Sequence, residues 1–471
     1  MILWLWIFIG VYIAALALLS YFAWRRTKSA DEYVMAGSNV GTIVGFLTYS
    51  ATLFSTFTLM GMPDFFRMHG VGAWIFLAVS DGAQVCLIVW FGLHLRRRAR
   101  QSGFRGTAGL LSSLYGNPLA GYVYFAGVFL FLTPYVAIQI RGLAIFLEAI
   151  FPSALPAWLW SAAIIVIMLI YSEIGGLRAI MYSDVMQGLM LLGVVWIVAI
   201  ACVGKIGGLE SLFVEVASVD ENLLSVPGPQ GLFTVQFLAA SFFAVLLLPV
   251  TQPQLTTRLM VIKDQRKMNR MAVAIGCFVL LILIPVALIG MYGAARYSEA
   301  GTREFLTGVL LTEQSGFIAA AAVVGLIAAA MSTADSQIFA LGTELRSLLK
   351  GDEKLVLRRT KWAVMAFAGA AMVFSVFTND QLVLLARVSF SGTALMAPMI
   401  LAGVLSNRRP GLEVIAAAGA ALIIFILSLI GLVPVMIGVA RLDLALLLLV
   451  ASFTAASTIV RSQKSRTALH S

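Results

Sequence analysis

The stretch TYSATLFSTFTLMGMP, residues 48–63, has six Ser and Thr residues in its first eleven positions, followed by Gly61 and Pro63. It belongs to an otherwise apolar segment, residues 41–63, that is long enough to cross a bilayer, which takes about 20 residues. Inside hydrocarbon an unpaired backbone group is costly, so irregular backbone is tolerated only beside protein or a cavity. The stretch therefore predicts a helix broken in the middle of the membrane for a functional reason.

The rest of the chain is equally apolar. Its 471 residues are 61% hydrophobic and 11% charged, with a mean hydropathy of +0.97, whereas soluble domains carry about 25% charged residues. A single all-α polytopic membrane domain, residues 1–471, is expected. Apolar runs long enough to span predict thirteen transmembrane helices: 2–24, 41–63, 73–94, 119–148, 158–178, 184–204, 233–253, 272–295, 315–345, 361–378, 382–404, 411–434 and 441–460.

The distribution of Lys and Arg predicts the orientation, because cytoplasmic loops retain these residues. With the N-terminus outside and the C-terminus inside, 25 of the 32 Lys and Arg residues, Arg258 among them, fall on the cytoplasmic side. The plasma membrane is the expected location, since a cation gradient exists there. The net charge of +10 is scattered over several loops beside lipid, which argues against a nucleic-acid partner.

A second span is also interrupted. SFFAVLLLPVTQPQ, residues 241–254, has Pro249 and Pro253 on either side of Thr251 and Gln252. Interrupted helices at corresponding positions of two halves indicate an inverted-repeat transporter with its site near the midplane. The alternative is that Ser, Thr, Gly and Pro only aid packing or kink a helix. We expect a leading helix (2–24), a first repeat (41–204), an inverted second repeat (233–404), two trailing helices (411–460) and a cytoplasmic tail (461–471).

Motifs for nucleotide binding or hydrolysis are missing from the sequence. No stretch matches the P-loop, the dinucleotide fingerprint, the nucleophile elbow or the zinc-protease motif, and there are only three His residues. Cys86, Cys202 and Cys277 lie in apolar spans without metal-ligand spacing. The sequence predicts neither an enzyme nor an organic cofactor, and an ion gradient is the expected energy source.

The ninth predicted span has an unusual polar cluster, AAAMSTADSQ, residues 328–337. Ser332, Asp335 and Ser336 share one helix face because residues three and four apart are neighbours. A hard alkali cation prefers several oxygen ligands, which these side chains and carbonyls freed at the break of the second span would supply. Back-bonding of the hydroxyls to their own helix is the alternative, although it leaves Asp335 needing a partner.

Together these stretches resemble the sodium:solute symporter family over nearly the whole chain. The matching segments are RRTKSADEYVMAGSNVG (25–41), the broken span ending LMGMP, YSEIGGLRAIMYSDVMQG (171–188), QPQLTTRLMVIKD (252–264) and AAAMSTADSQ. The resemblance implies the five-plus-five inverted-repeat (LeuT-type) fold and sodium-coupled transport of sugars, proline, sialic acid, pantothenate or monocarboxylates.

The resemblance also implies two cation sites. The first would use the carbonyls of Ala51, Phe54 and Ala329 and the hydroxyls of Ser332 and Thr333. The second, for Na⁺ or a proton, would use Asp184, Ser332, Asp335 and Ser336. Asp184 has an alternative role, as an acid at the N-terminus of the sixth span, where a negative charge suits the helix dipole.

Candidate solute contacts are less constrained. Arg141 lies well inside the fourth span, where a cation is costly unless paired or beside water, and a guanidinium suits a carboxylate. Its alternatives are a pair with Asp81 or Glu148, or snorkelling, which is also expected of Arg387. Ser55, Thr58, Phe242 and Gln252 are the other candidates.

The expected function is sodium-coupled symport of a small organic solute by alternating access. A monocarboxylate or amino acid is preferred over a sugar, because an intramembrane arginine favours an anion. Proline is disfavoured by Val245 and Pro249, where the family's proline carriers have aromatic residues. The rival interpretations are a proton-coupled carrier on the same fold, a non-transporting sensor and a channel.

Overall fold

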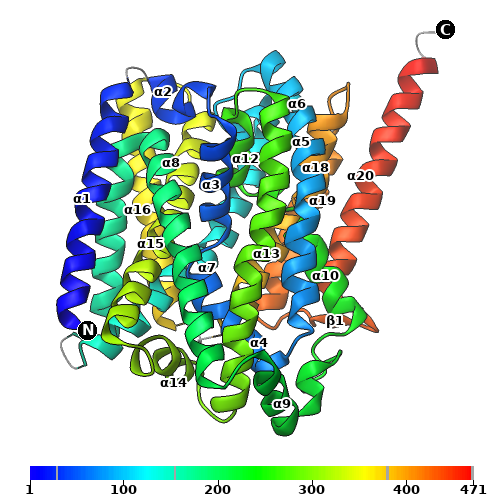
Figure 1. Cartoon of the computed structure of the whole chain (residues 1–471). Helices are drawn as coiled ribbons and strands as arrows, with labels where there is room; N and C mark the ends of the chain where they lie inside the picture. Colours follow the sequence, from blue (N-terminus) through cyan, green and yellow to red (C-terminus); the bar gives the residue numbers. More distant parts are fainter. Residues whose placement is uncertain (28–29, 153–154, 378–380, 468–471) are drawn as a thin grey trace.

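The computed structural model describes residues 1–27, 30–152, 155–377 and 381–467. Long helices run roughly side by side along one axis, and the N-terminus and the end of α20 lie at opposite ends of the bundle (Figure 1). Helix α15 occupies the interior, with 78% of its most apolar window buried, whereas only 17% of the corresponding window of α1 is buried. The polar cluster of residues 328–337 is therefore carried by a central helix.

The helices of the first half come in long spanning elements and short connecting ones. In chain order they are α1 (Ile2–Arg26), α2 (Ala30–Met35), η1 (Ala36–Ser38), α3 (Thr42–Leu53), η2 (Phe57–Gly61), α4 (Met62–His69), η3 (Ile75–Val79), α5 (Ser80–Ser102), α6 (Thr107–Tyr115), α7 (Pro118–Ile150), α8 (Ala157–Lys205), α9 (Leu209–Val219) and η4 (Glu221–Leu224).

The second half follows the same pattern and adds one small hairpin. Its elements are α10 (Val235–Leu246), α11 (Leu248–Thr251), α12 (Pro253–Val261), α13 (Gln265–Arg296), α14 (Thr302–Thr307), η5 (Gly308–Thr312), α15 (Gly316–Leu348), α16 (Glu353–Phe377), α17 (Leu382–Ala394), α18 (Ala397–Leu405), α19 (Leu412–Leu429), β1 (Met436–Ile437), β2 (Ala440–Arg441) and α20 (Leu442–Thr467). Strands β1 and β2 pair antiparallel.

The described part of the chain contains ten helices long and apolar enough to cross a membrane, or eleven with the bent α3–α4 pair counted as one span. Two further predicted spans coincide with shorter apolar helices, Trp158–Ile167 and Val235–Leu246. Within α8 the backbone breaks at Gly176, whose φ of +63° suits glycine. The helical membrane architecture is confirmed, and the count of thirteen stays a prediction.

Both spans predicted to be interrupted are broken. In the second span, α3 ends at Leu53, Phe54 is extended (φ −98°, ψ 123°), and the chain resumes at Phe57 with a bend of 57°. In the seventh, Gln252 is extended (φ −96°, ψ 118°) between α11 and α12. The Ser/Thr-rich run and the Pro pair therefore mark real helix breaks.

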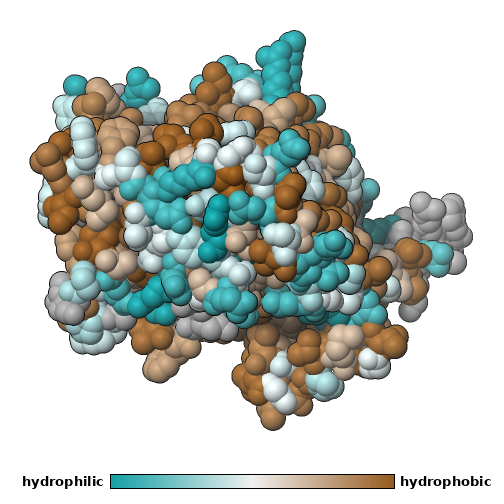
Figure 2. Space-filling view, turned by 60° about the horizontal axis from the view of Figure 1, so that its bottom comes forward, coloured by the Kyte–Doolittle hydropathy of each residue, from teal (hydrophilic) through white to brown (hydrophobic). Residues whose placement is uncertain are grey.

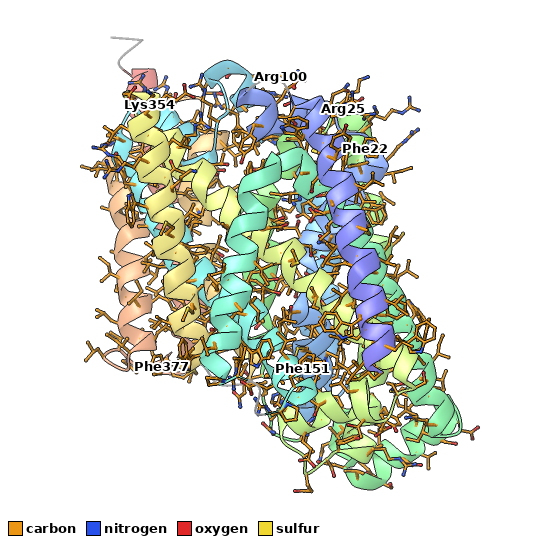
Figure 3. The ribbon with its side chains drawn as sticks, turned by 90° about the vertical axis from the view of Figure 1, so that its left-hand side faces the viewer. Phe22, Arg25, Arg100, Phe151, Lys354 and Phe377 are labelled. Atoms are coloured by element: carbon orange, nitrogen blue, oxygen red, sulfur yellow. The ribbon has the colours of Figure 1, made fainter. Side chains whose placement is uncertain are left out.

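Three labelled basic residues mark one end of the bundle. Arg25, Arg100 and Lys354 lie at one end, whereas Phe151 and Phe377 lie at the other (Figure 3). Seen toward the end that carries the N-terminus, the surface has a central band of hydrophilic residues with hydrophobic residues beside it (Figure 2). The basic end is also the end at which α20 finishes, opposite the end that carries the N-terminus.

Candidate cation and solute site

The polar segment of α15 lies against both halves of the bundle. Helix α15 packs against α8, α7, α1, α12 and α3. Its small residues allow close approach: a Cβ on Gly325 would lie 2.7 Å from a methyl carbon of Val194 on α8. Ser332, Thr333, Asp335 and Ser336 are all at most 2% exposed, so their oxygens face protein, not lipid.

Three of the five predicted ligands of the first cation site converge. The Ser332 hydroxyl lies 3.1 Å from the carbonyl oxygen of Ala51, at the end of α3, and 3.0 Å from that of Ala329. The Thr333 hydroxyl is buried without a hydrogen-bond partner. Phe54 is the extended residue that caps the end of α3, so its carbonyl leaves the helical direction at this position. Back-bonding within α15 accounts for one contact of Ser332 and for none of Thr333.

The second predicted cation site already contains the positively charged guanidinium of an arginine. A guanidinium nitrogen of Arg258 on α12 lies 2.6 Å from Asp184 on α8 and 2.8 Å from the Ser336 hydroxyl. Its Nε donates to Thr48 at 3.0 Å, and Thr48 in turn donates to Asp184 at 2.5 Å. Two of the four predicted ligands are therefore bonded to an arginine.

This arrangement corrects two sequence-based interpretations. The Lys and Arg distribution predicts Arg258 in a cytoplasmic loop, yet its side chain is only 1% exposed, because α12 continues the broken seventh span between α3, α5 and α15. Asp184 does not begin a helix: it follows the Gly176 break by eight residues inside α8, and its carboxylate is held by Arg258. The helix-dipole alternative for Asp184 is wrong.

Asp335 is the unsatisfied member of the set. It is fully buried, and neither carboxylate oxygen has a hydrogen-bond partner. Among the residues that the structure describes, no basic side chain forms an ion pair with it. A buried carboxylate without hydrogen bonds is expensive, so this group is suited to bind a cation or a proton.

Side chains of α7 satisfy the backbone at both breaks, which the sequence reasoning missed. Tyr135 donates to the carbonyl of Leu53 at 3.3 Å, and Tyr124 donates to the carbonyl of Thr251 at 3.1 Å. The amide of Gln139 accepts from the Thr56 N–H at 3.2 Å and donates to Ser55 at 3.2 Å. A Gln in the middle of an apolar span was the available signal for this role.

The predicted solute contacts lie in two environments. Ser55, Thr58 and Gln252 are buried at the breaks, where the Thr58 hydroxyl accepts from the Ser55 N–H at 3.1 Å and the Gln252 amide nitrogen has no hydrogen-bond partner. Phe242 is half-buried and packs edge-on against Phe243. Arg141 is half-buried on α7, half a turn beyond Gln139. Its role as a solute contact stays a prediction.

Ion pairs bear on the alternatives that the sequence leaves open for Arg141 and Arg387. Glu148 pairs with Arg303, and no ion pair joins Asp81 to a basic residue in the described part of the chain. Arg387 does not snorkel: it lies 2.6 Å from Asp443 on α20 and donates to Ser241 on α10 at 2.7 Å. The lone acid at the start of the last span compensates this arginine.

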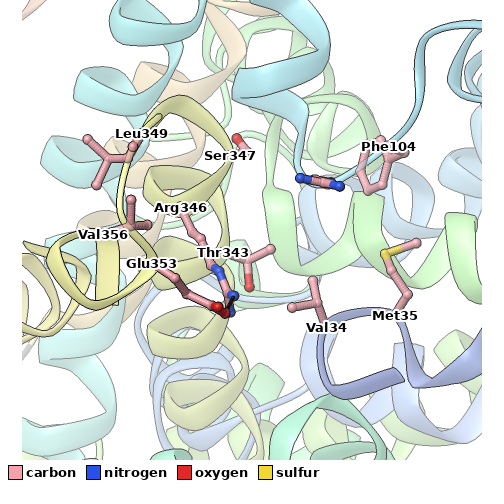
Figure 4. A pocket seen from close by; sticks show the side chains of 11 residues that line it. Val34, Met35, Phe104, Thr343, Arg346, Ser347, Leu349, Glu353 and Val356 are labelled. Atoms are coloured by element: carbon pink, nitrogen blue, oxygen red, sulfur yellow. Dashed lines mark hydrogen bonds and ion pairs between the residues drawn. The ribbon is translucent and has the colours of Figure 1, made fainter. Parts of the chain in front are cut away.

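A cavity of about 330 Å³ opens beside the basic end of α15. Figure 4 shows Thr343, Arg346 and Ser347 on its wall, with Val34 and Met35 of α2 opposite, and the ion pair of Arg346 with Glu353 at 3.3 Å. Arg105 also lines it. This cavity adjoins the end of the helix whose midpoint carries the polar cluster.

Comparisons with known proteins agree with this geometry. The profile of the Sodium:solute symporter family matches residues 33–410. The chain is 26% identical to the high-affinity proline transporter PutP of Bacillus subtilis over 414 residues, 83% of this chain and 85% of that protein. It is 25% identical to the sodium/pantothenate symporter of Haemophilus influenzae, over 67% of this chain and 65% of that one.

A solved structure shares the whole fold. It is the substrate-bound outward-open state of a Na⁺-coupled sialic acid symporter, with a TM-score of 0.78 and 17% identity, covering 97% of both chains. The protein described here belongs to the sodium:solute symporter family. Its class is that of integral membrane transporters that couple movement of a small organic solute to sodium, and it is not an enzyme.

Proposed function

We propose that the chain carries a carboxylate-bearing solute inward together with Na⁺ bound between the break of the second span and α15. The observation that carries this proposal is the approach of the Ser332 hydroxyl to the Ala51 and Ala329 carbonyls, at 3.1 and 3.0 Å. The buried, unpartnered Thr333 hydroxyl beside it adds a further oxygen. Na⁺ would take the carbonyls of Ala51, Phe54 and Ala329 and the hydroxyls of Ser332 and Thr333 as a set of hard oxygen ligands.

This position links the ion to the solute. Na⁺ held by Ala51 and Phe54 would fix the end of α3, and Ser55 and Thr58 of the same break would then be ordered for the solute. Because such coupling is reciprocal, bound solute would tighten Na⁺ to the same degree. In alternating access, the ion and the solute would be released together at the cytoplasmic end.

Arg258 occupies two of the four ligands predicted for the second cation site. With its guanidinium on Asp184 and Ser336, the predicted second set retains Ser332 and the unpartnered Asp335. We propose that Asp335 takes a second Na⁺ or a proton there, and that Arg258 leaves its partners when the α12 end of the bundle opens. A proton-coupled carrier is the alternative that Asp335 favours.

The preference for a carboxylate rests on charge. Arg141 is a cation within α7, although it leaves that helix on a different face from Gln139, two residues earlier, and a guanidinium pairs with a carboxylate through two parallel hydrogen bonds. Proline, pantothenate and sialic acid, named for the relatives above, all bear a carboxylate. Val245 and Pro249 stand where the family's proline carriers have aromatic residues, and this difference favours a solute other than proline.

The arrangement in the membrane is part of the same proposal. Thirteen spans, with residues 41–204 and 233–404 as inverted repeats, would place the N-terminus outside and the C-terminus in the cytoplasm. The basic end that carries Arg25, Arg100 and Lys354 (Figure 3) would face the cytoplasm, as Lys and Arg do in plasma-membrane proteins.

The test is uptake into proteoliposomes with and without an inward Na⁺ gradient. The labelled panel would hold acetate, pyruvate, lactate, alanine, proline, glutamate, pantothenate, glucose and sialic acid. We expect Na⁺-dependent uptake of one carboxylate, lost when Ser332→Ala and Thr333→Ala are combined. Ser375→Ala is the matched control, because the Ser375 hydroxyl is buried and bonds only to its own helix, at the carbonyl of Met372 (2.7 Å).

Two outcomes would contradict the proposal. Uptake that ignores Na⁺, follows an inward pH gradient and is abolished by Asp335→Asn would establish the proton-coupled alternative. Na⁺-dependent uptake that the Ser332 and Thr333 substitutions leave intact would place the ion elsewhere and refute the ligand set.

A further inference from the structure

A second buried carboxylate lies near the breaks and has no part in the cation sites described above. Asp81, in the first turn of α5, is 5% exposed. Ser80, Asp81, Gln84 and Ile88 form one buried face of α5, as their spacing requires. This face points into the bundle, where α5 packs against α10, α11, α12 and α13.

Asp81, like Asp335, differs from three other buried acids because no arginine in the described part of the chain offsets its charge. Asp184, Asp443 and Asp64 each have an arginine at 2.6, 2.6 and 2.8 Å. Among the described residues, Asp81 is hydrogen-bonded to the amide of Gln84, whose Nε2 donates to it at 2.7 Å. Within the described residues, no Lys, Arg or His pairs with it. A single neutral hydrogen bond does not compensate a carboxylate inside a membrane span.

Three buried oxygens on α3 and α5 also lack partners. The Tyr49 hydroxyl, the Ser80 hydroxyl and the Gln84 carbonyl oxygen are all buried without a hydrogen bond. The carboxylate interacts electrostatically with Tyr49 and Tyr135. This set of acceptors, which we call the Asp81 cluster, therefore consists of Tyr49, Ser80, Asp81 and Gln84.

The Asp81 cluster lies beside the proposed solute position. Tyr49 is on the last turn and a half of α3, before the break, and Tyr135 donates to the Leu53 carbonyl at the break itself. On the other side, α5 contacts α11, which ends at the break of the seventh span. Asp81 is thus carried by a helix that packs against the break of the seventh span, and its charge acts on tyrosines of α3 and α7 near the break of the second span.

We propose that the Asp81 cluster binds a positively charged amino group of the solute, so that the solute is an amino acid or a related zwitterion. The inference rests on the proposed function and narrows it. An alkylammonium group has three N–H donors and a positive charge, which match one carboxylate and several unpartnered oxygens. A solute with only a carboxylate would add a second negative charge to this region, which would disfavour its binding.

The experiment compares paired solutes that differ only in the amino group. Competition with labelled solute would be measured for alanine against propionate and for proline against cyclopentanecarboxylate, with wild type, Asp81→Asn and Tyr49→Phe, all at a fixed Na⁺ gradient. We expect wild type to prefer the amino-bearing member of a pair by at least tenfold. Asp81→Asn should raise its KM by at least tenfold and should reduce the discrimination to within about threefold.

Tyr49→Phe keeps the carboxylate and removes one acceptor, so a smaller rise in KM, of about two- to fivefold, is expected. This variant keeps the inference testable if Asp81→Asn does not fold. The dependence of uptake on Na⁺ concentration, including its Hill coefficient, should be unchanged in both variants, because the Asp81 cluster would hold solute and not the coupling ion.

The result that overturns the inference differs from the one that overturns the proposed function. Na⁺-dependent uptake of a solute without an amino group, with KM unaltered in Asp81→Asn, would refute the amino-group site and leave the symporter standing. A lower Hill coefficient for Na⁺ in Asp81→Asn would identify the Asp81 cluster as an ion site and also refute the inference. Absence of any Na⁺-dependent uptake across the panel would refute the proposed function itself.

Discussion

The ion pair of Arg258 and Asp184 offers the sharpest test of how the bundle is held together. It joins α12 of the broken seventh span to α8, and the same guanidinium reaches Thr48 on α3 and Ser336 on α15. Arg258→Met keeps much of the side-chain volume and removes the charge, whereas Asp184→Asn is nearly isosteric. We expect each single substitution to destabilise the fold strongly and the pair together to cost much less than their sum.

The magnitude follows from burial. The side chains are 1% and 0% exposed and their charged atoms lie 2.6 Å apart, so either single substitution leaves the other charge alone in the interior. Breaking a buried pair in this way costs about 3–5 kcal/mol, whereas replacing both partners by neutral groups is often close to neutral. The coupling free energy between the two positions should therefore be at least about 3 kcal/mol.

The assay is reversible unfolding of the purified chain in mixed micelles of increasing denaturing detergent, for wild type, both single variants and the double variant. Asn269→Ala on the exposed start of α13 serves as a control for handling, since Asn269 only accepts from Gln265 at the surface, at 2.9 Å. If the two single effects add to within about 0.5 kcal/mol, the pair is not coupled and the argument from burial fails.

Three further predictions concern the break, pH and topology. Gln139→Leu leaves the Thr56 N–H without its acceptor and should raise the Na⁺ concentration for half-maximal uptake by about tenfold. Gln139→Glu keeps an acceptor and should raise that concentration less. Equal Na⁺ dependence in wild type and Gln139→Leu would contradict the role of Gln139 in holding the break. Glu313 lies between η5 and α15, and although burial raises its pKa, hydrogen bonds from Tyr292, Tyr297 and Lys205 lower that pKa to a net value below 4.5. Its stabilising effect is therefore full above pH 4.5 and is lost as the pH falls through the folded-state pKa, so Glu313→Gln should lower the melting temperature at pH 7 and have little effect in strong acid; a difference that persists at pH 2 would contradict this sign. In a variant without Cys86, Cys202 and Cys277, an impermeant maleimide added to right-side-out vesicles should label Glu299→Cys and not Lys354→Cys, and the opposite pattern would reverse the proposed orientation.

The breaks in the membrane spans were accessible from sequence because they have local causes. Pro253 lacks an N–H, and the carbonyl of Pro249 instead accepts a hydrogen bond from the Thr256 hydroxyl at 3.1 Å. The helical face of Ser332, Asp335 and Ser336 also follows from spacing alone. What spacing could not give is the partner of each group, since Ser332 meets Ala51 across 281 residues of sequence.

The missed residues are those whose environment is set by other elements. The Lys and Arg distribution places Arg258 with the cytoplasmic residues and carries no information on its burial. The apolar run that follows it, Leu259 to Ile262, was the signal that the span continues. Gln139 and Arg387 were recognisable as polar residues in spans. Their partners, Thr56 and Asp443, depend on which helices pack together, and periodicity does not contain that information.

Polar contacts hold the broken second span at both of its ends, and the two sets of contacts are made with different neighbouring elements. At the N-terminal end, Thr48 of α3 is bonded to Asp184 and Arg258, and Val40 just before α3 pairs with Ile262 at the end of α12. At the other end, Arg67 of α4 donates to the carbonyls of Tyr297 and Ala300, both at 2.9 Å, while Asp64 accepts from Thr302 at 2.7 Å.

Alternating access would have to break one or the other of these two sets of contacts. Because α3 and the end of α12 are joined by backbone hydrogen bonds, they would move as one unit, and opening toward the basic end would separate Arg258 from Asp184 and Ser336. Opening toward the other end would instead release Arg67 from the loop after α13. The extended backbone at Phe54 lies between the two sets of contacts. An ion that orders this break would therefore change how readily either set of contacts separates. In this way Na⁺ at Ala51 and Ser332 would control access to the solute.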